Sequence, residues 1–309
     1  MAKVAAPVFA RVSTTPGNCV IVAAMKRGST LGKRPVVQRV AVVYKPTEPE
    51  GWPTDHRRRR AQREHRRTLD AVATTLGRLE LSCDLIERFR GIPEDRYDLV
   101  VTVGGDGTVL TTAHRVKDAP VLAVNSAPQD SEGFLTATDR NGFLRLLRSF
   151  LSGQVRPGLL RRLELVLNGR RIPELVLNDV LIAEANPAMI SRYALTVGGR
   201  TEEQRSSGVW VATAAGSTAA IRSAGGRALP LRSSMFQYIV REPYVGRGRW
   251  QMRLDGGCLG ASAALGCRSL MHRGTIFVDG AHVRYPFHYG DRLVVRATPE
   301  PLRMVGIGR

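Results

Sequence analysis

The sequence predicts a two-domain protein in which an α/β domain with a parallel sheet precedes a β-rich domain. The chain has 309 residues, 43% of them hydrophobic, which is enough to bury a large core. Up to residue 153, strand-like apolar runs alternate with helical segments, the pattern of a parallel sheet. Beyond it, apolar segments are short and closely spaced, which indicates a β-rich fold. We expect a basic arm over 1–34, an α/β domain over 35–153 and a β-rich domain over 154–309.

The first domain is predicted to contain strands joined by helices. An arginine-rich helix extends to about Leu79, a second follows a glycine loop, and a third is amphipathic, with Phe143, Leu146, Leu147 and Phe150 facing inward. In parallel sheets, ligands bind beyond the carboxyl ends of the strands, where the glycine loop and Asn125 both fall. The expected strands are 36–44, 81–87, 98–103 and 120–125, and the third helix is expected over 139–151.

The second domain is predicted from a series of short strands with one helical interruption at 216–225, again opened by glycine and hydroxyl residues. The expected strands are 163–167, 175–183, 193–197, 208–213, 237–241, 275–278 and 292–296.

The loop inside LVVTVGGDGTVL (99–110) is the strongest functional signal in the sequence. A buried strand breaks into Gly104, Gly105, Asp106 and Gly107 before apolar residues resume, so a glycine turn opens a helix. Glycines allow a phosphate to approach the amides at a helix N-terminus. A carboxylate beside phosphate is repulsive unless it holds a metal ion or accepts a proton from an attacking hydroxyl. Taken alone, the string is also compatible with an ordinary turn.

The net charge of +19 and the pI near 10.9 raise the question of nucleic-acid binding. Much of the excess lies in HRRRRAQREHRR (56–67), which holds seven arginines and no aromatic residue for base stacking. We therefore expect attraction of a polyanionic nucleotide substrate and not nucleic-acid binding.

Several function classes are disfavoured by composition. No apolar run approaches the roughly 18 residues of a membrane span, so we expect a soluble protein without a membrane partner. The cysteines have no CxxC spacing and the histidines no HExxH spacing, so no protein metal site is expected. Neither a GxxxxGK[ST] loop nor a GxGxxG after the first strand is present.

The N-terminal segment 1–34 is basic and contains no Asp or Glu. It is compatible with a mitochondrial transit peptide, but the richness in Ala and Arg throughout the chain favours a disordered basic arm. Because the few cysteines also indicate a reducing compartment, we expect a cytoplasmic protein, with a mitochondrial location as the alternative.

Three further stretches join the glycine loop in a recognisable order: NSAPQDSEGFLT (125–136), LNDVLI (177–182) and SSGVWVATAAGSTAAIRSAGG (206–226). Together with GGDGT they resemble the NAD kinase family over roughly residues 36–300. The Ser131-Glu132-Gly133 and Ser206-Ser207-Gly208 segments resemble its mitochondrial-type branch. GGDGT alone also occurs in lipid kinases of the diacylglycerol and sphingosine type, so the four stretches in order are the specific signal.

The resemblance implies a two-domain NAD kinase-like fold and transfer of a phosphate from ATP, or from polyphosphate, to NAD, giving NADP with Mg²⁺ as cofactor. It implies that Asp106 lies at the reacting 2′-hydroxyl of the adenosine ribose. It also implies a homodimer or larger homo-oligomer. Donor phosphates would lie on Gly104, Gly105, Gly107 and Thr108, the NAD ribose or adenine on Asn178 and Asp179, and the rest of the dinucleotide on Asn125, Thr218, Ala219 and Ser223.

The sequence departs from the family pattern at several positions. Asp179 replaces a Glu, Ser207 an Asp, Ala214-Ala215 a Pro-Thr pair, and Ala220 an aromatic residue. These changes bear on substrate affinity and on the choice between NAD and NADH more than on the reaction. Two alternatives therefore stay open: a GGDGT-type lipid kinase, and a catalytically silent dinucleotide- or nucleic-acid-binding protein.

Overall fold

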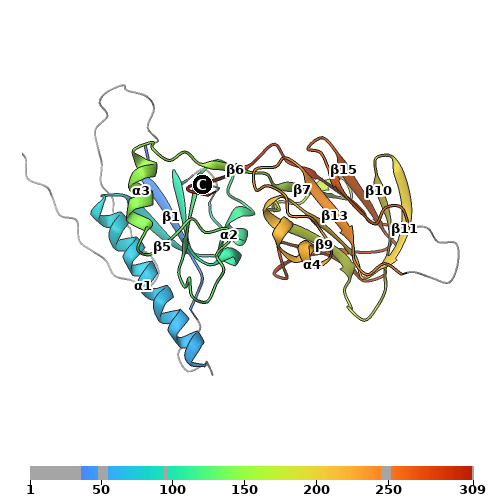
Figure 1. The fold of residues 1–309 in the computed structure, drawn as a ribbon, viewed down its shortest axis with the longest axis horizontal. Helices are drawn as coiled ribbons and strands as arrows, with labels where there is room; N and C mark the ends of the chain where they lie inside the picture. The colour runs from blue at the N-terminus through green and yellow to red at the C-terminus, as the bar shows by residue number, and fades with distance from the viewer. Residues whose placement is uncertain (1–35, 48–54, 94–95, 245–251, 308–309) are drawn as a thin grey trace, which may run out of the picture.

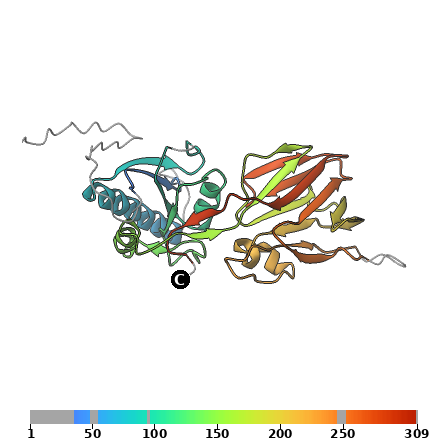
Figure 2. The same ribbon diagram turned by 90° about the horizontal axis from the view of Figure 1, so that it is seen from above.

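The computed structural model describes residues 36–47, 55–93, 96–244 and 252–307, which form two lobes (Figure 1). One lobe combines a largely parallel sheet with helices, and the other consists mainly of strands (Figure 2). The three sheets contain 7, 6 and 6 strands. The predicted fold class, an α/β domain with a β-rich domain, is therefore confirmed. The basic arm predicted over 1–34 lies outside the described residues.

The first sheet has the strand order β2-β1-β3-β4-β19-β6, and β5 also pairs with β4. β1, β2, β3 and β4 pair in parallel, so their carboxyl ends meet at one edge of the sheet. β3 and β4 are buried along their whole length, which explains their unbroken apolar sequence. β19 pairs in parallel with β4 and antiparallel to β6. The strands are β1 (Arg39–Tyr44), β2 (Ser82–Glu87), β3 (Leu99–Gly104), β4 (Val121–Asn125), β5 (Thr138–Asp139), β6 (Gly158–Leu160) and β19 (Leu302–Met304).

Within the described residues, three helices cover this sheet. α1 (His56–Arg78) and α3 (Phe143–Leu151) pack on one face, and α2 (Asp106–Ala113) packs on the other. Asp55 caps α1 by accepting a hydrogen bond from the backbone N–H of Arg58 at 2.7 Å. The inward face predicted for α3 is confirmed, since its members Phe143, Leu147 and Phe150 are buried and Leu146 packs against the same core.

The second lobe is a β-sandwich whose two sheets share one apolar core. The strand orders are β11-β10-β15-β18-β7-β8 and β14-β13-β12-β9-β16-β17. The short helices η1 (Ala215–Thr218) and α4 (Ala220–Ser223) follow β12. The strands are β7 (Leu163–Leu167), β8 (Arg170–Arg171), β9 (Asp179–Glu184), β10 (Ser191–Val197), β11 (Arg200–Ser206), β12 (Val209–Ala212), β13 (Phe236–Val240), β14 (Gly256–Leu259), β15 (Ala264–Ser269), β16 (Gly274–Val278), β17 (Val283–Phe287) and β18 (Arg292–Ala297).

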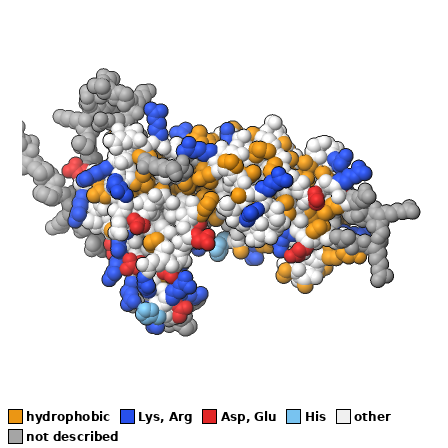
Figure 3. All heavy atoms as spheres, in the orientation of Figure 1, with side chains coloured by type: hydrophobic (Ala, Val, Ile, Leu, Met, Phe, Trp, Pro, Cys, Tyr) orange, Lys and Arg blue, Asp and Glu red, His pale blue; other side chains and the backbone are white. Residues whose placement is uncertain are grey.

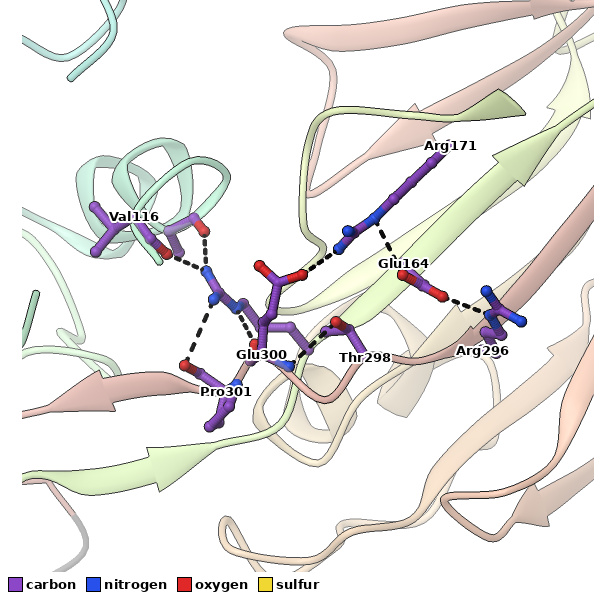
Figure 4. A network of polar contacts seen from close by, with 9 residues as sticks. Val116, Glu164, Arg171, Arg296, Thr298, Glu300 and Pro301 are labelled. Carbon is purple, nitrogen blue, oxygen red and sulfur yellow. Dashed lines mark hydrogen bonds and ion pairs between the residues drawn. The ribbon is translucent and has the colours of Figure 1, made fainter. Parts of the chain in front are cut away.

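Arg162 lies where the chain passes from one lobe to the other, and it is fully buried. Its Nη1 atom donates to the backbone carbonyl oxygens of Ala113 at 2.7 Å and Val116 at 2.6 Å, and its Nε atom donates to the carbonyl oxygen of Glu300 at 2.9 Å. Burial lowers the pKa of Arg162 to about 10. The guanidinium therefore joins the C-terminal end of α2 to the segment that contains Glu300. The ion pairs of Glu164 with Arg171 and Arg296 lie beside it (Figure 4).

Candidate active site

The glycine loop between β3 and α2 has the geometry of an anion site. A Cβ atom on Gly104 would lie 2.2 Å from the hydroxyl oxygen of Thr108, so only glycine fits there. Among the described residues, no side chain caps the N-terminus of α2, whose N-cap position is Gly105. The N–H of Thr108 donates to the carbonyl oxygen of Gly105 at 2.9 Å, so the amides of Asp106 and Gly107 are the ones available to an anion such as a phosphate group.

Asp106 is half-buried at the start of α2, and its carboxylate accepts two backbone hydrogen bonds. The N–H of Phe134 donates to Oδ2 at 3.0 Å, and the N–H of Leu135 donates to Oδ1 at 2.8 Å. These bonds attach the GFLT segment of the sequence to the glycine loop. Asp106 is thereby fixed in orientation, and its carboxylate has acceptor sites left for a further hydrogen bond.

A pocket of about 550 Å³ opens beside the loop at the carboxyl edge of the first sheet. It brings together four predicted residues, Gly105, Asp106, Gly107 and Thr108, with Asn125 at the end of β4. Gly104 belongs to the same loop but is buried beneath it. The pocket is also lined by three cationic side chains. Arg58 belongs to the arginine run 56–67 that was expected to attract a nucleotide, whereas Lys45 and Arg88 were not selected by the sequence analysis.

Arg88 follows β2 directly, and its Nη1 atom lies 3.6 Å from the position that a Cβ atom on Gly107 would occupy. Its Nε atom is buried and has no hydrogen-bond partner in the described part of the chain. Burial lowers the pKa of Arg88. A guanidinium held above a glycine loop with an unsatisfied N–H is well suited to an anionic ligand. Its place after a predicted strand was the sequence signal for this residue.

His65 and Ser126 form a buried hydrogen-bonded pair in the same pocket. His65 Nε2 lies 2.8 Å from the carbonyl oxygen of Lys45, so this nitrogen carries a proton, and Nδ1 lies 2.8 Å from the Ser126 hydroxyl oxygen. Burial lowers the pKa of His65, which favours the neutral ring and makes Nδ1 the acceptor. The helical spacing of His65, Thr68, Val72 and Leu76 was the signal that places His65 on the buried face of α1.

The second group of predicted residues lies at the start of β9. Asn178 is half-buried and Asp179 is buried. A Cβ atom on Gly216 would lie 2.1 Å from the carbonyl oxygen of Asn178, so the absence of a side chain lets η1 approach this turn. The N–H of Thr213 donates to the same carbonyl oxygen at 2.9 Å. LNDV and the AGST segment therefore form one structural unit.

The electrostatics of this unit are unusual. The pKa of Asp179 is raised to about 7, mainly by burial and secondarily by the negative charge of Asp279. Asn178 Oδ1 is buried and makes no hydrogen bond to any described residue. A buried amide oxygen without a donor is costly in a finished structure, so this atom is suited to a ligand that supplies one.

The remaining predicted residues lie farther out. Thr218 and Ser223 are exposed and Ala219 is half-buried, within η1 and α4 or between them. Ser223 and Ala220 line a separate hollow of about 550 Å³ together with Trp210 and Arg241. Ser223 is thus not in the pocket that contains Asp106.

A shared core connects the two groups of predicted residues. Leu177 and Ala215 from the second lobe are buried in the same cluster as Val109 and Ala113 of α2. The glycine loop lies at one end of this eight-residue helix, which is about 12 Å long. The LNDV unit therefore packs against the helix that begins with Asp106.

Comparison with known proteins gives the family. Residues 32–155 match the ATP-NAD kinase N-terminal domain. A probable NADH kinase of Oryza sativa subsp. japonica is 33% identical over 270 residues, which cover 79% of this chain and 82% of that protein. The chain belongs to the NAD kinase family.

Two solved structures have the same fold as this NAD kinase family member. The NAD kinase from Archaeoglobus fulgidus in complex with ATP matches with a TM-score of 0.63 and 24% identity, over 86% of this chain and 92% of that one. Yeast NADH kinase complexed with NADH matches with a TM-score of 0.65 and 22% identity, over 87% and 83%. The family and the kinase class expected from the four motifs are confirmed.

The described part of this NAD kinase holds neither a membrane-spanning helix nor a group of three metal ligands. Across 36–47, 55–93, 96–244 and 252–307, no helix is both long and apolar enough to cross a membrane. Within the same ranges, no three His, Cys, Asp or Glu side chains are grouped as ligands for a metal ion.

Proposed function

We propose that this chain transfers the terminal phosphate of ATP to the 2′-hydroxyl of the adenosine ribose of NAD or NADH. The observation that carries the proposal is the pocket beside the glycine loop, where uncapped helix amides, the Arg88 guanidinium and the Asp106 carboxylate meet. The amides and cations bind the donor phosphates and balance charge that builds up during transfer. Asp106 accepts the proton of the attacking hydroxyl.

The acceptor dinucleotide is assigned to the unit formed by Asn178, Asp179 and the 216–219 segment. The unsatisfied Asn178 Oδ1 atom supports this, because the adenine amino group and the ribose hydroxyls are donors. Ala219 and Thr218 border the same unit, and Ser223 with its hollow would receive the more distant part of the dinucleotide. The names of the rice and yeast relatives support NADH as an acceptor beside NAD.

Mg²⁺ is expected to arrive with the ATP. This ion usually keeps several waters and binds through substrate phosphates and one or two carboxylates. Asp106 and Asp130 line the donor pocket, which fits such a site, although Asp130 is paired with Arg57 at 2.8 Å. The bound ion would neutralise phosphate charge.

The chain is further proposed to form a homodimer through the outer face of the β14-β13-β12-β9-β16-β17 sheet. Ile239, Trp210, Leu181 and Phe277 are paired neighbours across four of its strands, and all are half-exposed. A continuous apolar row of this kind is typical of an interface. Light scattering tests this: Trp210→Glu with Phe277→Glu is expected to give a monomer, and an unchanged mass would contradict the proposal.

A cytoplasmic location completes the proposal. Cys258 and Cys267 form no disulfide in the described structure, in keeping with a reducing compartment. Fractionation of cells carrying the tagged full-length protein tests it against the mitochondrial alternative.

The function is tested by measuring product with purified protein. We expect NADP from NAD, or NADPH from NADH, with ATP and Mg²⁺, and the same assay with polyphosphate defines the donor. The same assay with diacylglycerol in place of the dinucleotide tests the lipid-kinase alternative. Phosphorylation of the lipid alone would replace the proposal, and dinucleotide binding without any product would indicate the catalytically silent alternative.

A further inference from the structure

A buried carboxylate outside the predicted site holds the acceptor unit. Asp279 follows β16, has a positive φ of 47°, and its side chain is 0% exposed. Oδ1 accepts the backbone N–H groups of Asn178 at 2.7 Å and Asp179 at 3.0 Å, and Oδ2 accepts that of Leu177 at 2.9 Å. The N–H of Asp279 donates in return to the carbonyl oxygen of Asp179 at 2.9 Å. The backbone of the LNDV turn is thus fixed by one side chain.

The same carboxylate reaches the other lobe. His114 Nε2 lies 3.1 Å from Asp279 Oδ2, and the His114 side chain is only 7% exposed. His114 is the C-cap residue of α2, the helix that begins at the glycine loop. Because one short helix separates them, the donor loop and the acceptor turn are connected by a continuous series of hydrogen bonds and packed backbone.

A second contact joins the turn after β16 to the donor pocket. His282, three residues after Asp279, packs edge-on against the ring of Phe89, with ring centroids 5.4 Å apart. The Arg88 guanidinium lies 4.3 Å from the centroid of the same Phe89 ring. The 279–282 turn therefore contacts two of the elements that present groups to the donor pocket, α2 and the segment after β2.

We propose that Asp279 is a positioning residue for the acceptor dinucleotide, and that through His114 it couples the two substrate sites, so that each substrate binds more tightly when the other is present. This rests on the proposed function. Binding of donor phosphates at the start of α2 favours one position of the helix. Because Asp279 is bonded both to His114 at the end of α2 and to the backbone of the turn, that position of the helix favours one position of the turn that carries Asn178 and Asp179. The coupling is reciprocal, as linkage requires.

A purely structural role would make Asp279 one of several bonds that hold the lobes together. A neighbouring set of hydrogen bonds provides the control. In it, Glu174 accepts hydrogen bonds from Arg115, at 3.1 Å, and from the Tyr285 hydroxyl. Arg115 adjoins His114, yet the hydrogen bonds of this set do not involve 177–179. Tyr285→Phe removes a comparable bond near the same junction without altering the turn.

Asp279→Asn is the test variant, because Asn accepts the positive φ while its amide group places a donor against a backbone N–H. NADH and NAD affinities are measured by calorimetry, with and without a non-hydrolysable ATP analogue and Mg²⁺. We expect Asp279→Asn to weaken dinucleotide binding about tenfold or more and to leave binding of the analogue alone within about twofold. His114→Ala is expected to retain most dinucleotide affinity and to lose the enhancement by the analogue, while Tyr285→Phe behaves as wild type.

The inference is overturned by dinucleotide binding of Asp279→Asn that equals wild type, or by an equal loss in Tyr285→Phe. If Asp279→Asn does not fold, His114→Ala decides, and an undiminished enhancement in that variant overturns the coupling. Wild-type protein that makes NADP(H) but shows no enhancement also overturns it. Wild-type protein that binds no dinucleotide refutes the proposed function itself.

Discussion

The backbone N–H of Leu135 donates to Asp106 Oδ1 at 2.8 Å, although the two residues are 29 positions apart in the sequence. With the second bond from Phe134, the carboxylate holds the segment that directly follows Asp130 and Ser131 of the donor pocket. Asp106 therefore has two roles in the proposed reaction, one towards the substrate hydroxyl and one towards its own surroundings.

Asp106→Asn is expected to lower kcat on the order of a hundredfold or more, because the positioned base is lost. One of the two backbone N–H groups would also face an amide N–H₂, so a loss of about 1 to 3 kcal/mol in unfolding free energy is expected. Kinetics and thermal unfolding measure the two effects separately. A variant with near wild-type kcat would remove Asp106 from the chemistry.

Arg88→Ala is expected to raise the KM for ATP about tenfold, because the guanidinium above Gly107 would no longer meet the donor phosphates. Arg90→Ala provides the matched control. Its side chain is 77% exposed and forms an ion pair with Glu87 at 3.5 Å, so its removal should change little. Equal KM values in Arg88→Ala and wild type would exclude a phosphate contact.

The arginines at the start of α1 lie on the projecting end of the first lobe, where blue side chains gather in Figure 3. Reversal of Arg57–Arg60 to Glu is expected to raise the KM for ATP most at low salt, because Arg58 lines the pocket and exposed charges are screened. Reversal of the exposed Arg192 and Arg205 is the control. Weak RNA and DNA binding at physiological salt is expected, and tight binding that disappears on reversal of 57–60 would contradict this interpretation.

The Asp179→Asn variant is expected to be more stable than the wild type, by a difference that grows as the pH rises. The folded-state pKa of about 7 lies above the usual value of about 3.9, so the folded state binds the extra proton and wild-type stability falls between those pH values. The Asn variant does not titrate. Its Tm advantage over wild type should be absent near pH 4 and reach on the order of 5 °C by pH 8. A difference that does not change with pH would show that Asp179 titrates normally.

Gly216→Ala is expected to raise the KM for NAD or NADH, because the added Cβ atom must move η1 away from the Asn178 backbone. Gly260→Ala is the control, since the same atom there meets nothing within 4 Å. Steady-state kinetics with saturating ATP measures the effect. Unchanged kinetics in Gly216→Ala would indicate that the acceptor turn adapts at no cost.

The sequence predicted the elements whose signals are local. The buried strands around 99–104 and 121–125, the glycine turn and the apolar face of 143–151 all appear where periodicity indicates. Leu302–Met304 was not predicted as a strand, because three residues carry no recognisable alternation and their partner β4 is about 180 positions away. Arg88, His65 and Asp279 were missed for a related reason. Their roles arise from contacts between distant segments, which composition and spacing do not contain.

The position of β19 also has a consequence for how the protein is made. The first sheet contains β4 and β6, and the strand between them, β19, is among the last residues of the chain. During synthesis, residues 36–160 leave the ribosome with β5 beside the carboxyl end of β4 but with no partner at this edge for the Val121 end of β4, and the β-sandwich follows before Leu302–Met304 can close the gap. Since domains otherwise tend to fold in the order of their translation, the lobe that begins the chain here becomes complete last.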